Sequence, residues 1–548
     1  MALDLTTEQR ELGKANFQRT VGELADPGVN RRQFMKGLLA AGAVLPIPVA
    51  VYFGYKALQG NPVRAGLIGG GDEGGVLIGS HNKDFLDFVA VSDIRPYNQE
   101  RIFRGEPTGL RLGFDRIYGK NARKKIQLYP DYKDLLKDKN VEAVVIALPL
   151  HLHAKVAIEA MEHGKHVLCE KLMAWNITQC KDMIRAAYKH DRILTIGHQR
   201  HYSMLYAQAS EVLDSGILGD VKYIRALWHR NNSWPQLDAD GKEKKDPVTQ
   251  EPLLRDSWHP PIPPEDYKAL KDRIQDLGYK SLEHLIRWRL YNATGGGLMA
   301  ELGSHQLDAC SIFLGKVHPL AVSGYGNKLF YHDDREVDDS VFVTFEFPGK
   351  GYYADPEHKL VNKSNKNDVV VVTYSSINTN QFENYGECVM GTRGTMVVEA
   401  EQNVMLFKEK NPNEQQAARS MSVTVSSGPA GKPALDAAGS VPTAAERSAQ
   451  DKGQGAAGSG PVSRGYREEM EHFAYCIRMH DKAKGTDREQ WRLTPKCHGA
   501  VAMADAIIAL TANKAMRENR RIEFKPEWFD PENSAVPDAD MKPAEPPV

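Results

Sequence analysis

Residues 63–74 read VRAGLIGGGDEG, and this stretch decides the fold. An apolar run, Val63 to Ile68, leads directly into Gly69-Gly70-Gly71-Asp72-Glu73-Gly74, which fits the pattern G-x-G-x-x-G. Directly after a strand, such glycines permit a tight turn and a close approach of the backbone to a pyrophosphate. The stretch therefore predicts a Rossmann-type dinucleotide-binding domain, with Gly69, Gly71 and Gly74 at the cofactor.

A second apolar run, Phe88 to Ser92, ends in Asp93. A carboxylate in this position accepts hydrogen bonds from the ribose diol of the nucleotide. Asp93 would repel a 2′-phosphate and so favours NAD, whereas Arg95, two residues further on, could contact such a phosphate. NAD is the predicted cofactor, and NADP remains the alternative.

Two more apolar runs continue the parallel sheet. Ala143 to Ala147 carries no charge, as expected for a strand that is covered on both faces. The run His166 to Glu170 brings Lys171 to the end of the next strand, and ligands bind at the carboxyl ends of parallel strands. Lys171 is therefore a candidate catalytic or substrate-positioning cation. The alternative is an exposed lysine where a strand meets a loop.

The dinucleotide-binding domain is predicted over residues 62–197, and a second domain over residues 198–524. Runs typical of strands at 221–228, 340–347, 368–374 and 388–400 are separated by turn signals rather than by regular helices. The predicted fold class is α/β, a Rossmann domain followed by an α+β domain with a mainly antiparallel sheet. A last long helix is expected to begin with Thr494 as its N-cap.

Two insertions and a flexible tail interrupt or follow this plan. The insertions are predicted near 235–276 and 411–463, and the tail at 525–548. The second insertion is rich in Ala, Gly, Ser and Pro, so it offers little apolar surface to offset the entropy of ordering. We expect this insertion to be disordered.

Residues 1–60 are predicted to form an export signal. The run Asn30-Arg31-Arg32-Gln33-Phe34-Met35-Lys36 resembles a twin-arginine motif, and residues 37–55 after it carry no charge. The alternative is a helix cap before a buried helix, which Pro46 and Pro48 disfavour. Because no clear cleavage site follows, residues 37–55 could stay as a membrane anchor. We expect a periplasmic protein, or one anchored so that it faces away from the cytoplasm.

The overall composition excludes several classes of function. The 548 residues contain 70 Lys and Arg against 71 Asp and Glu, so no net field favours nucleic acid as a partner. The six cysteines are scattered and predict neither a disulfide framework nor a zinc site. Small neutral substrates fit this balance of charge.

Residues 295–308 read GGGLMAELGSHQLD and contain a polar stripe. In a regular α-helix, Glu301, His305 and Asp308 would share one face. An imidazole between two carboxylates suits proton transfer, because it titrates near neutrality and its partners fix its tautomer. The alternative is a solvated polar face.

At this point the motifs together resemble the Gfo/Idh/MocA family of sugar oxidoreductases. They are the glycine loop, Asp93, the run AVVIALPLHLHA from Ala143, GKHVLCEK at 164–171 and GGGLMAELGSHQLD at 295–308. The resemblance spans residues 62–410 and 464–524. Leu172 stands where the family has a proline, which puts the geometry of that loop in doubt, and Glu301 stands where the family usually has Asp.

The resemblance implies hydride transfer between a sugar carbon and a nicotinamide. Lys171 would be the catalytic lysine, His305 would take the hydroxyl proton, and Glu301 would orient His305. Further contacts with the cofactor are implied for Pro149, His153 and Glu170. The candidate substrate contacts are Asp308, His229, Arg200 and Arg289.

Export would restrict the reactions that this enzyme could catalyse, because no dependable pool of free NAD exists outside the cytoplasm. The enzyme should then keep its nucleotide and restore its oxidation state in each cycle. Sugar oxidoreduction is the first hypothesis, and an NAD-dependent glycosidase or lyase that forms a transient keto-sugar is the second. The third is a non-catalytic nucleotide-binding surface protein, which the loss of the motif proline at Leu172 permits. No metal is predicted, and exposed sheet surface suggests a homo-oligomer.

Overall fold

A parallel sheet spans residues 63–197 of the computed structural model, which describes residues 5–24, 49–107, 109, 111–409, 422–427, 433–438 and 463–537. Its strands lie in the order β3-β2-β1-β4-β5-β6. They are β1 (Val63–Ile68), β2 (Leu86–Ser92), β3 (Gln127–Tyr129), β4 (Ala143–Ile146), β5 (His166–Glu170) and β6 (Leu194–Gly197). In this order the topology switches between β1 and β4, where dinucleotides bind in such sheets. The predicted Rossmann domain is confirmed.

Helices cover this sheet, as a fully parallel sheet requires. They are α4 (Asp72–Ser80), α5 (Pro96–Arg104), α6 (Phe114–Tyr118), α7 (Ala122–Lys125), α8 (Tyr132–Lys137), α9 (His153–Glu162) and α10 (Ile177–Lys189). Strand β4 is fully buried along its length. This burial explains why its sequence is one unbroken apolar run.

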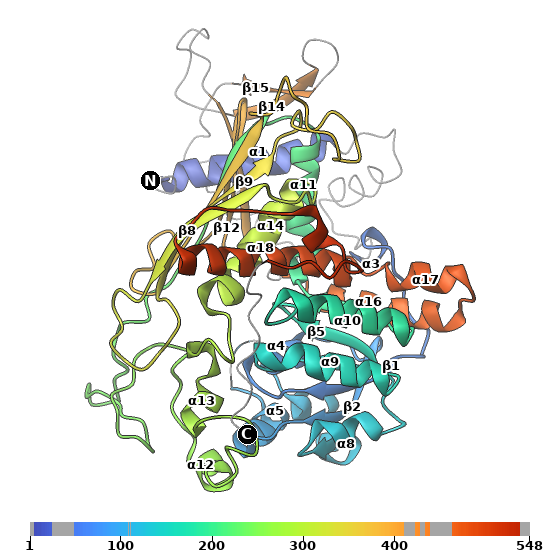
Figure 1. The fold of residues 1–548 in the computed structure, drawn as a ribbon, viewed down its shortest axis with the longest axis vertical. Coiled ribbons are helices and arrows are strands. Elements are labelled where there is room, and N and C mark those ends of the chain that lie inside the picture. Colours follow the sequence, from blue (N-terminus) through green and yellow to red (C-terminus); the bar gives the residue numbers. More distant parts are fainter. Residues whose placement is uncertain are drawn as a thin grey trace, which may run out of the picture.

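The second sheet is mainly antiparallel, as predicted. Its strands lie in the order β13-β12-β11-β7-β10-β9-β8-β16, and β7 with β10 is its parallel pair. The strands are β7 (Val221–His229), β8 (Ala321–Asn327), β9 (Ser340–Pro348), β10 (Val369–Ile377), β11 (Tyr385–Gly391), β12 (Gly394–Glu399), β13 (Asn403–Lys408) and β16 (Ile522–Glu523). Helices α11 (Met204–Asp214) and α14 (Ser304–Phe313) pack on this sheet, and α18 (Gly499–Glu518) contacts both β8 of this sheet and α10 and β6 of the Rossmann domain (Figure 1).

Two local predictions for this domain are wrong. Residues 388–400 form parts of two strands, β11 and β12, because a turn between Gly391 and Gly394 reverses the chain. Helix α18 begins at Gly499 with His498 as its N-cap, and not at Thr494. The short helix α17 (Thr486–Arg492) ends just before Thr494, so that residue lies in the connection between the two helices.

Helix α16 (Tyr466–Lys482) returns from the far end of the chain to the Rossmann domain. Its apolar face, which includes Phe473 and Ile477, shares a core with Val63 and Leu67 of β1. The guanidinium of Arg478 donates hydrogen bonds to the main-chain oxygens of Asn61 and Pro62 and to the carboxylate of Glu142. Residues 463–482 are therefore part of the nucleotide-binding domain in space.

The N-terminal region is partly integrated into the fold. Helix α1 (Thr7–Leu24) packs on β13 and buries Phe17, and α3 (Val49–Tyr52) leads into Phe53 and Tyr55, which are 3% exposed. These contacts are not predicted by the sequence. Arg31, Arg32 and residues 37–48 of the predicted export signal lie outside the described residues. Within the described part, no helix combines the length and apolar character needed to span a membrane.

The two predicted insertions and the predicted tail all contain ordered residues. In the region 411–463, strands β14 (Ser422–Ser427) and β15 (Pro433–Ala438) pair antiparallel, so these twelve residues are not irregular. The start of the predicted flexible tail is anchored, since the Lys181 ammonium donates to the main-chain oxygens of Glu527, Asn533 and Ala535. The segment near 235–276 is part of an ordered unit with helices α12 (Pro264–Leu270) and α13 (Leu282–Ile286).

Candidate active site

The glycine loop lies at the carboxyl edge of the Rossmann sheet. Gly69 has φ +102°, and a Cβ atom there would lie 2.2 Å from the main-chain oxygen of Ala147. A Cβ atom on Gly74 would lie 2.1 Å from the oxygen of Gly69, whereas one on Gly71 would meet no atom closer than 3.9 Å. The loop is therefore closed on its inner side and open at Gly71, where α4 begins. This arrangement fits a pyrophosphate at the start of α4.

Asp93 lies beside this loop. One carboxylate oxygen accepts hydrogen bonds from the Gly70 N–H at 2.8 Å and the Asn98 amide at 3.1 Å. The other accepts from the Arg95 N–H at 2.8 Å. Each carboxylate oxygen can accept two hydrogen bonds, so one lone pair of the second oxygen remains for a ribose hydroxyl. The residues present fit a dinucleotide.

Lys171 follows β5 at the same edge. The Lys171 ammonium donates to the main-chain oxygen of Glu301 at 2.9 Å. The main-chain N–H of Lys171 donates to the Glu170 carboxylate at 3.2 Å. The Lys171–Leu172 peptide bond is cis, and Leu172 is 1% exposed. The Lys171 ammonium thus lies between the end of β5 and the helical segment that carries His305.

Two carboxyl groups accompany this ammonium, from Glu73 of the glycine loop and Glu170. Burial raises the pKa of Glu73, although Lys171 and Arg289 oppose this shift. Burial and the neighbouring Glu73 raise the pKa of Glu170 well above its usual value. Each group also has one buried oxygen without a hydrogen-bond partner in the described part of the chain. Both carboxyl groups are therefore harder to ionise here than they would be in water.

His305 presents an imidazole that is ready to accept a proton. Among the described residues neither ring nitrogen has a hydrogen-bond partner, and the ring contacts Trp228 with 5.6 Å between centroids. Burial, with Lys171 and Arg200 nearby, lowers the pKa of His305 well below 6.5. The His305 side chain is 9% exposed, and its imidazole is therefore neutral near neutral pH.

Glu301 does not orient His305, contrary to the sequence prediction. Its carboxylate pairs with Arg289 at 2.8 Å, and it lies in a π-helical turn, Met299–Gly303, directly before α14. Burial opposes ionisation of Glu301, but Arg289 and Lys171 outweigh burial and hold its pKa below the usual value. Glu301 and Asp308 thus bind other side chains, and neither carboxylate makes a hydrogen bond to the His305 ring among the described residues.

Asp308 is also displaced from its predicted role as a substrate contact. It is 1% exposed, and its carboxylate lies 2.8 Å from the His201 ring and 2.7 Å from the Lys316 ammonium. Burial works against ionisation here too, but His201 and Lys316 hold the pKa of Asp308 well below its usual value. Asp308 is a buried structural carboxylate beneath the site.

Two further predicted substrate contacts lie elsewhere. Arg200 is 1% exposed and pairs with Glu387 at 2.8 Å and Glu401 at 2.7 Å, while it donates to the main-chain oxygen of His305. His229 hydrogen-bonds with Ser375, and it follows Trp228 on β7, so its side chain points to the opposite face of the sheet. Arg200 supports the site from below, and His229 does not reach it.

The remaining predicted residues, Arg289, Pro149 and His153, differ in their exposure. Arg289 is 27% exposed and pairs with Glu301, so it can face a ligand. Pro149 lies just beyond β4 and is partly exposed. The ring nitrogens of His153 lie 2.9 Å from the main-chain oxygens of Leu148 and Leu172, so His153 ties together the loops after β4 and β5.

Sequence reasoning missed groups that only the fold brings to the site. Glu73 lies inside the glycine motif, where its acidic side chain was a visible signal. Glu469 on α16 has no such signal, because it follows a long insertion. It is fully buried, neither carboxylate oxygen has a partner in the described residues, and burial with Glu170 nearby raises its pKa well above the usual value.

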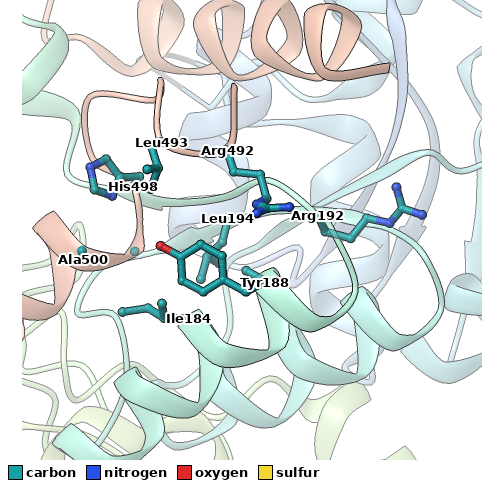
Figure 2. A pocket seen from close by; sticks show the side chains of 10 residues that line it. Ile184, Tyr188, Arg192, Leu194, Arg492, Leu493, His498 and Ala500 are labelled. Atoms are coloured by element: carbon teal, nitrogen blue, oxygen red, sulfur yellow. The ribbon is translucent and has the colours of Figure 1, made fainter. Parts of the chain in front are cut away.

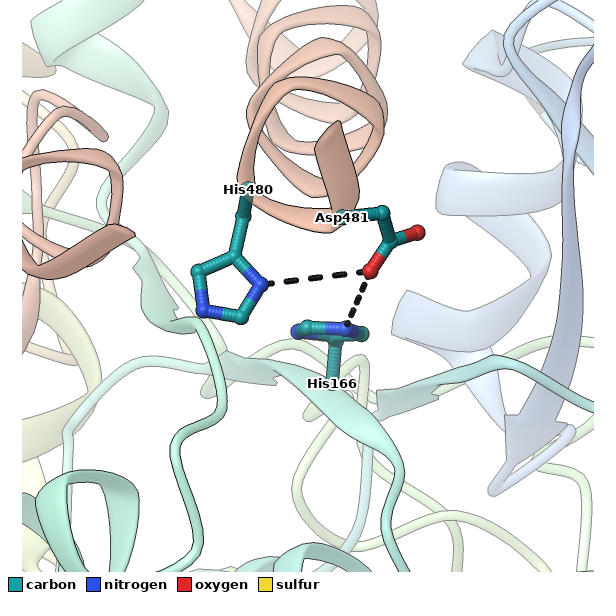
Figure 3. Close-up of side chains that lie close together, drawn as sticks. All are labelled: His166, His480 and Asp481. Carbon is teal, nitrogen blue, oxygen red and sulfur yellow. Dashed lines mark ion pairs between the residues drawn. The ribbon is translucent and has the colours of Figure 1, made fainter. Parts of the chain in front are cut away.

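Among the described residues, three clusters of His, Cys or Asp side chains could hold a metal ion, because their ligand atoms lie within 4.8 Å of one another. Two of them contain Asp505, whose carboxylate lies 3.2 Å from the Lys316 ammonium. The third, His166, His480 and Asp481, lies where β5 begins, at the edge opposite to Lys171 (Figure 3). There the guanidinium of Arg478 lies 3.4 Å from Asp481. A basic side chain thus supplies positive charge in each cluster, and we assign no metal.

A separate pocket of about 280 Å³ lies between α10, β6 and the start of α18 (Figure 2). Tyr188, Arg192, Arg492 and His498 contribute its polar groups. Leu194, in its wall, is the first residue of β6, so the pocket lies at the amino edge of the sheet. It is therefore distinct from the site at Lys171.

Comparison with known proteins gives two family matches. Residues 63–198 match an oxidoreductase family with an NAD-binding Rossmann fold, Gfo/Idh/MocA, and residues 276–397 match the Gfo/Idh/MocA C-terminal domain. Among solved structures, the aldose-aldose oxidoreductase of Caulobacter crescentus gives a TM-score of 0.50 at 16% identity, covering 85% of this chain and all of that chain. This likeness concerns the fold.

Curated relatives match over shorter regions. The inositol 2-dehydrogenase of Salmonella typhimurium is 32% identical over 148 residues, which are 26% of this chain and 41% of that protein. The 2,7-anhydro-N-acetylneuraminate hydratase of Mediterraneibacter gnavus is 24% identical over 251 residues, 44% of this chain and 54% of that protein. The chain thus spans only about half the length of such relatives. Two separate parts of the chain therefore resemble this family, residues 63–198 its NAD-binding domain and residues 276–397 its C-terminal domain.

Proposed function

We propose that this protein is an NAD(P)-dependent oxidoreductase that acts on a hydroxyl-bearing carbon of a sugar or polyol. The convergence of the Lys171 ammonium and the unpartnered His305 imidazole beside the glycine loop carries this proposal. Oxidation of an alcohol needs a base for the hydroxyl proton and a cation for the developing oxygen charge. The relatives named as an inositol dehydrogenase and an aldose-aldose oxidoreductase agree with such a substrate.

Gly69, Gly71, Gly74 and Asp93 would hold the nucleotide, whose nicotinamide supplies the hydride chemistry when bound. His305 accepts the proton of the substrate hydroxyl at one of its ring nitrogens. Lys171 stabilises the substrate oxygen as negative charge develops on it. Its bond to the main-chain oxygen of Glu301 fixes the ammonium in place beforehand. Arg289, held by Glu301, contacts the substrate or the nucleotide at the rim of the cleft.

The lowered pKa of His305 predicts the pH dependence of the oxidation. A group with a lowered pKa stays in its basic form down to that lowered value, so activity is lost only as the pH falls through it. We expect kcat/KM for oxidation to stay constant down to pH values below 6.5. A pH profile of the wild-type protein and of His305→Ala would test this, since the variant should lack the acid limb. An acid limb centred above pH 6.5 would contradict the assignment.

We further propose that the nucleotide stays bound and is returned to its starting oxidation state. The export signal predicted around Arg31 and Arg32 supports this idea, because an exported enzyme cannot draw on free NAD. A second candidate function is then redox-neutral elimination or hydrolysis through a transient keto-sugar. The relative named as a hydratase favours it, since hydration involves no net oxidation.

The test of both candidates uses the full-length protein as purified. Mass spectrometry of acid-precipitated protein should find a released nicotinamide dinucleotide. Mixing the protein with sugars, polyols or aryl glycosides, with no added acceptor, separates the two reactions. A change in absorbance of the bound nucleotide supports oxidoreduction, and release of aglycone without net reduction supports elimination. Protein that neither contains nor binds a dinucleotide would overturn both.

A further inference from the structure

Segment 232–290, which contains the predicted insertion, covers the nucleotide-binding edge of the Rossmann domain. It has a small core of its own, formed by Ile262, Leu270, Ile274, Tyr279, Leu282, Leu285 and Ile286. Ile94, the residue after Asp93, packs against this core. In Figure 1, α12 lies beside α5 and α13 lies next to α12. The segment therefore borders the place where Asp93 would bind a ribose.

The segment is braced internally and also contacts the loop after β4. The buried carboxylate of Asp246 accepts hydrogen bonds from the Ile262 N–H at 2.9 Å and from the Arg287 guanidinium at 2.9 Å. On the cleft side, the ring of Tyr279 meets that of His151 edge-to-face, with 5.6 Å between centroids. His151 belongs to the loop after β4, so the segment spans from the end of β2 to the end of β4.

Asp266, on α12, makes the decisive contact. It is fully buried, and one carboxylate oxygen lies 2.8 Å from Nε of Arg95. The other oxygen accepts the Tyr97 N–H at 2.9 Å, in the first turn of α5. A buried, charge-assisted pair with this second bond fixes the Arg95 guanidinium toward α12.

Arg95 is the cation that follows Asp93 by two residues, where a 2′-phosphate on the ribose would need a positive charge. The Asp266 carboxylate binds Nε, offsets part of the guanidinium charge and orients the group toward α12, and turning Arg95 fully toward a phosphate would leave a buried carboxylate without its counter-charge, which is costly. The Asp93 carboxylate alone would repel the phosphate. Both effects disfavour a 2′-phosphate and leave a 2′-hydroxyl unaffected.

We propose that Asp266 sets the nucleotide specificity of this protein. By holding Arg95, it denies a 2′-phosphate its counter-charge, so the site binds NAD and rejects NADP. The inference rests on the proposed nucleotide-dependent function. It assigns the specificity to a residue 171 positions away from Arg95 in the sequence, supplied by the added segment.

The test measures the thermal unfolding midpoint of the nucleotide-depleted, full-length protein against increasing NAD or NADP. Asp266→Asn keeps an acceptor for the Tyr97 N–H but removes the charge that holds Arg95. Its apparent affinity for NADP should rise about 10- to 100-fold, the range of one hydrogen bond to a charged group, with little change for NAD. Asp266→Asn/Arg95→Ala should lose this gain. Glu265→Gln removes the exposed neighbouring charge and should behave as the wild type.

The outcomes separate this inference from the proposed function. If the wild type binds NAD and Asp266→Asn still rejects NADP, the role of Asp266 is wrong and the function stands. If the wild type binds NADP as well as NAD, the role of Asp266 is likewise wrong. If it binds neither nucleotide, both proposals fail. Should Asp266→Asn not fold, Arg95→Ala decides, because it should leave both affinities unchanged. A tenfold loss of NADP binding in that variant would overturn the inference.

Discussion

Replacing Lys171 by methionine should lower turnover by about 10²- to 10⁴-fold, the range for a positioned electrostatic or proton-transferring group. Methionine keeps an unbranched side chain that is only one atom shorter, but it removes the charge that faces the substrate oxygen. The bound nucleotide should remain, because the glycine loop and Asp93 are unchanged. The measurement is single-turnover reduction of the bound nucleotide with the best substrate from the sugar and polyol panel.

Two controls make this result specific. Lys189→Met removes an exposed lysine at the end of α10 and should leave turnover unchanged. Lys171→Arg tests whether charge alone is sufficient, and we expect little recovery, since a planar guanidinium cannot replace the compact ammonium that donates to Glu301. Wild-type turnover in Lys171→Met, with its nucleotide still bound, would remove Lys171 from the mechanism.

Arg200→Met should destabilise the protein by about 3–5 kcal/mol, the usual cost of removing one partner of a buried ion pair. Two carboxylates, Glu387 and Glu401, lose their guanidinium, and the main-chain oxygen of His305 loses a donor. Glu401 retains Arg464, whereas within the described part of the chain Glu387 retains only the hydrogen bond from the Tyr206 hydroxyl. Urea denaturation followed by tryptophan fluorescence measures the loss.

A more exposed arginine that also pairs with a glutamate provides the comparison. Arg225 on β7 pairs with Glu383 but is 22% exposed, so Arg225→Met should cost about 1 kcal/mol or less. Burial raises the pKa of Glu387 to about 7 despite Arg200, so this carboxylate accepts a proton readily. Adding Glu387→Gln to Arg200→Met should therefore recover part of the stability. Equal losses in Arg200→Met and Arg225→Met would show that the buried network contributes little.

The strands and motifs of the Rossmann domain could be predicted because their causes are local. Strand β1 ends at the first glycine of its loop, as predicted, because burial on both faces demands an apolar run and the turn demands glycine. The Asn176 side chain caps α10 by accepting a hydrogen bond from the Gln179 N–H. Both residues of this cap lie within four positions of sequence, so the cap could be recognised locally. Lys171 could be singled out because it ends a buried strand.

Other parts of the site depend on distant or irregular features. The shared role of Glu301, His305 and Asp308 was inferred from their helical spacing, but Glu301 pairs with Arg289 and Asp308 with His201 and Lys316. Spacing along one helix does not indicate which of these partners each carboxylate will take. Arg200 is polar and near the motifs, but its partners lie 187 and 201 residues away. No local pattern indicates that Asp266 will meet Arg95 or that Glu469 will lie beside Glu170.

The return of α16 to the Rossmann domain also bears on how the chain folds during synthesis. Nascent domains usually fold one after another, the N-terminal domain first. Here Phe473 and Ile477 complete the core around β1, and Arg478 closes over Asn61 and Pro62. The nucleotide-binding domain therefore cannot reach its final form when residue 198 leaves the ribosome. It must wait for nearly three hundred more residues, so its maturation is coupled to that of the second domain, and cofactor loading belongs after chain completion.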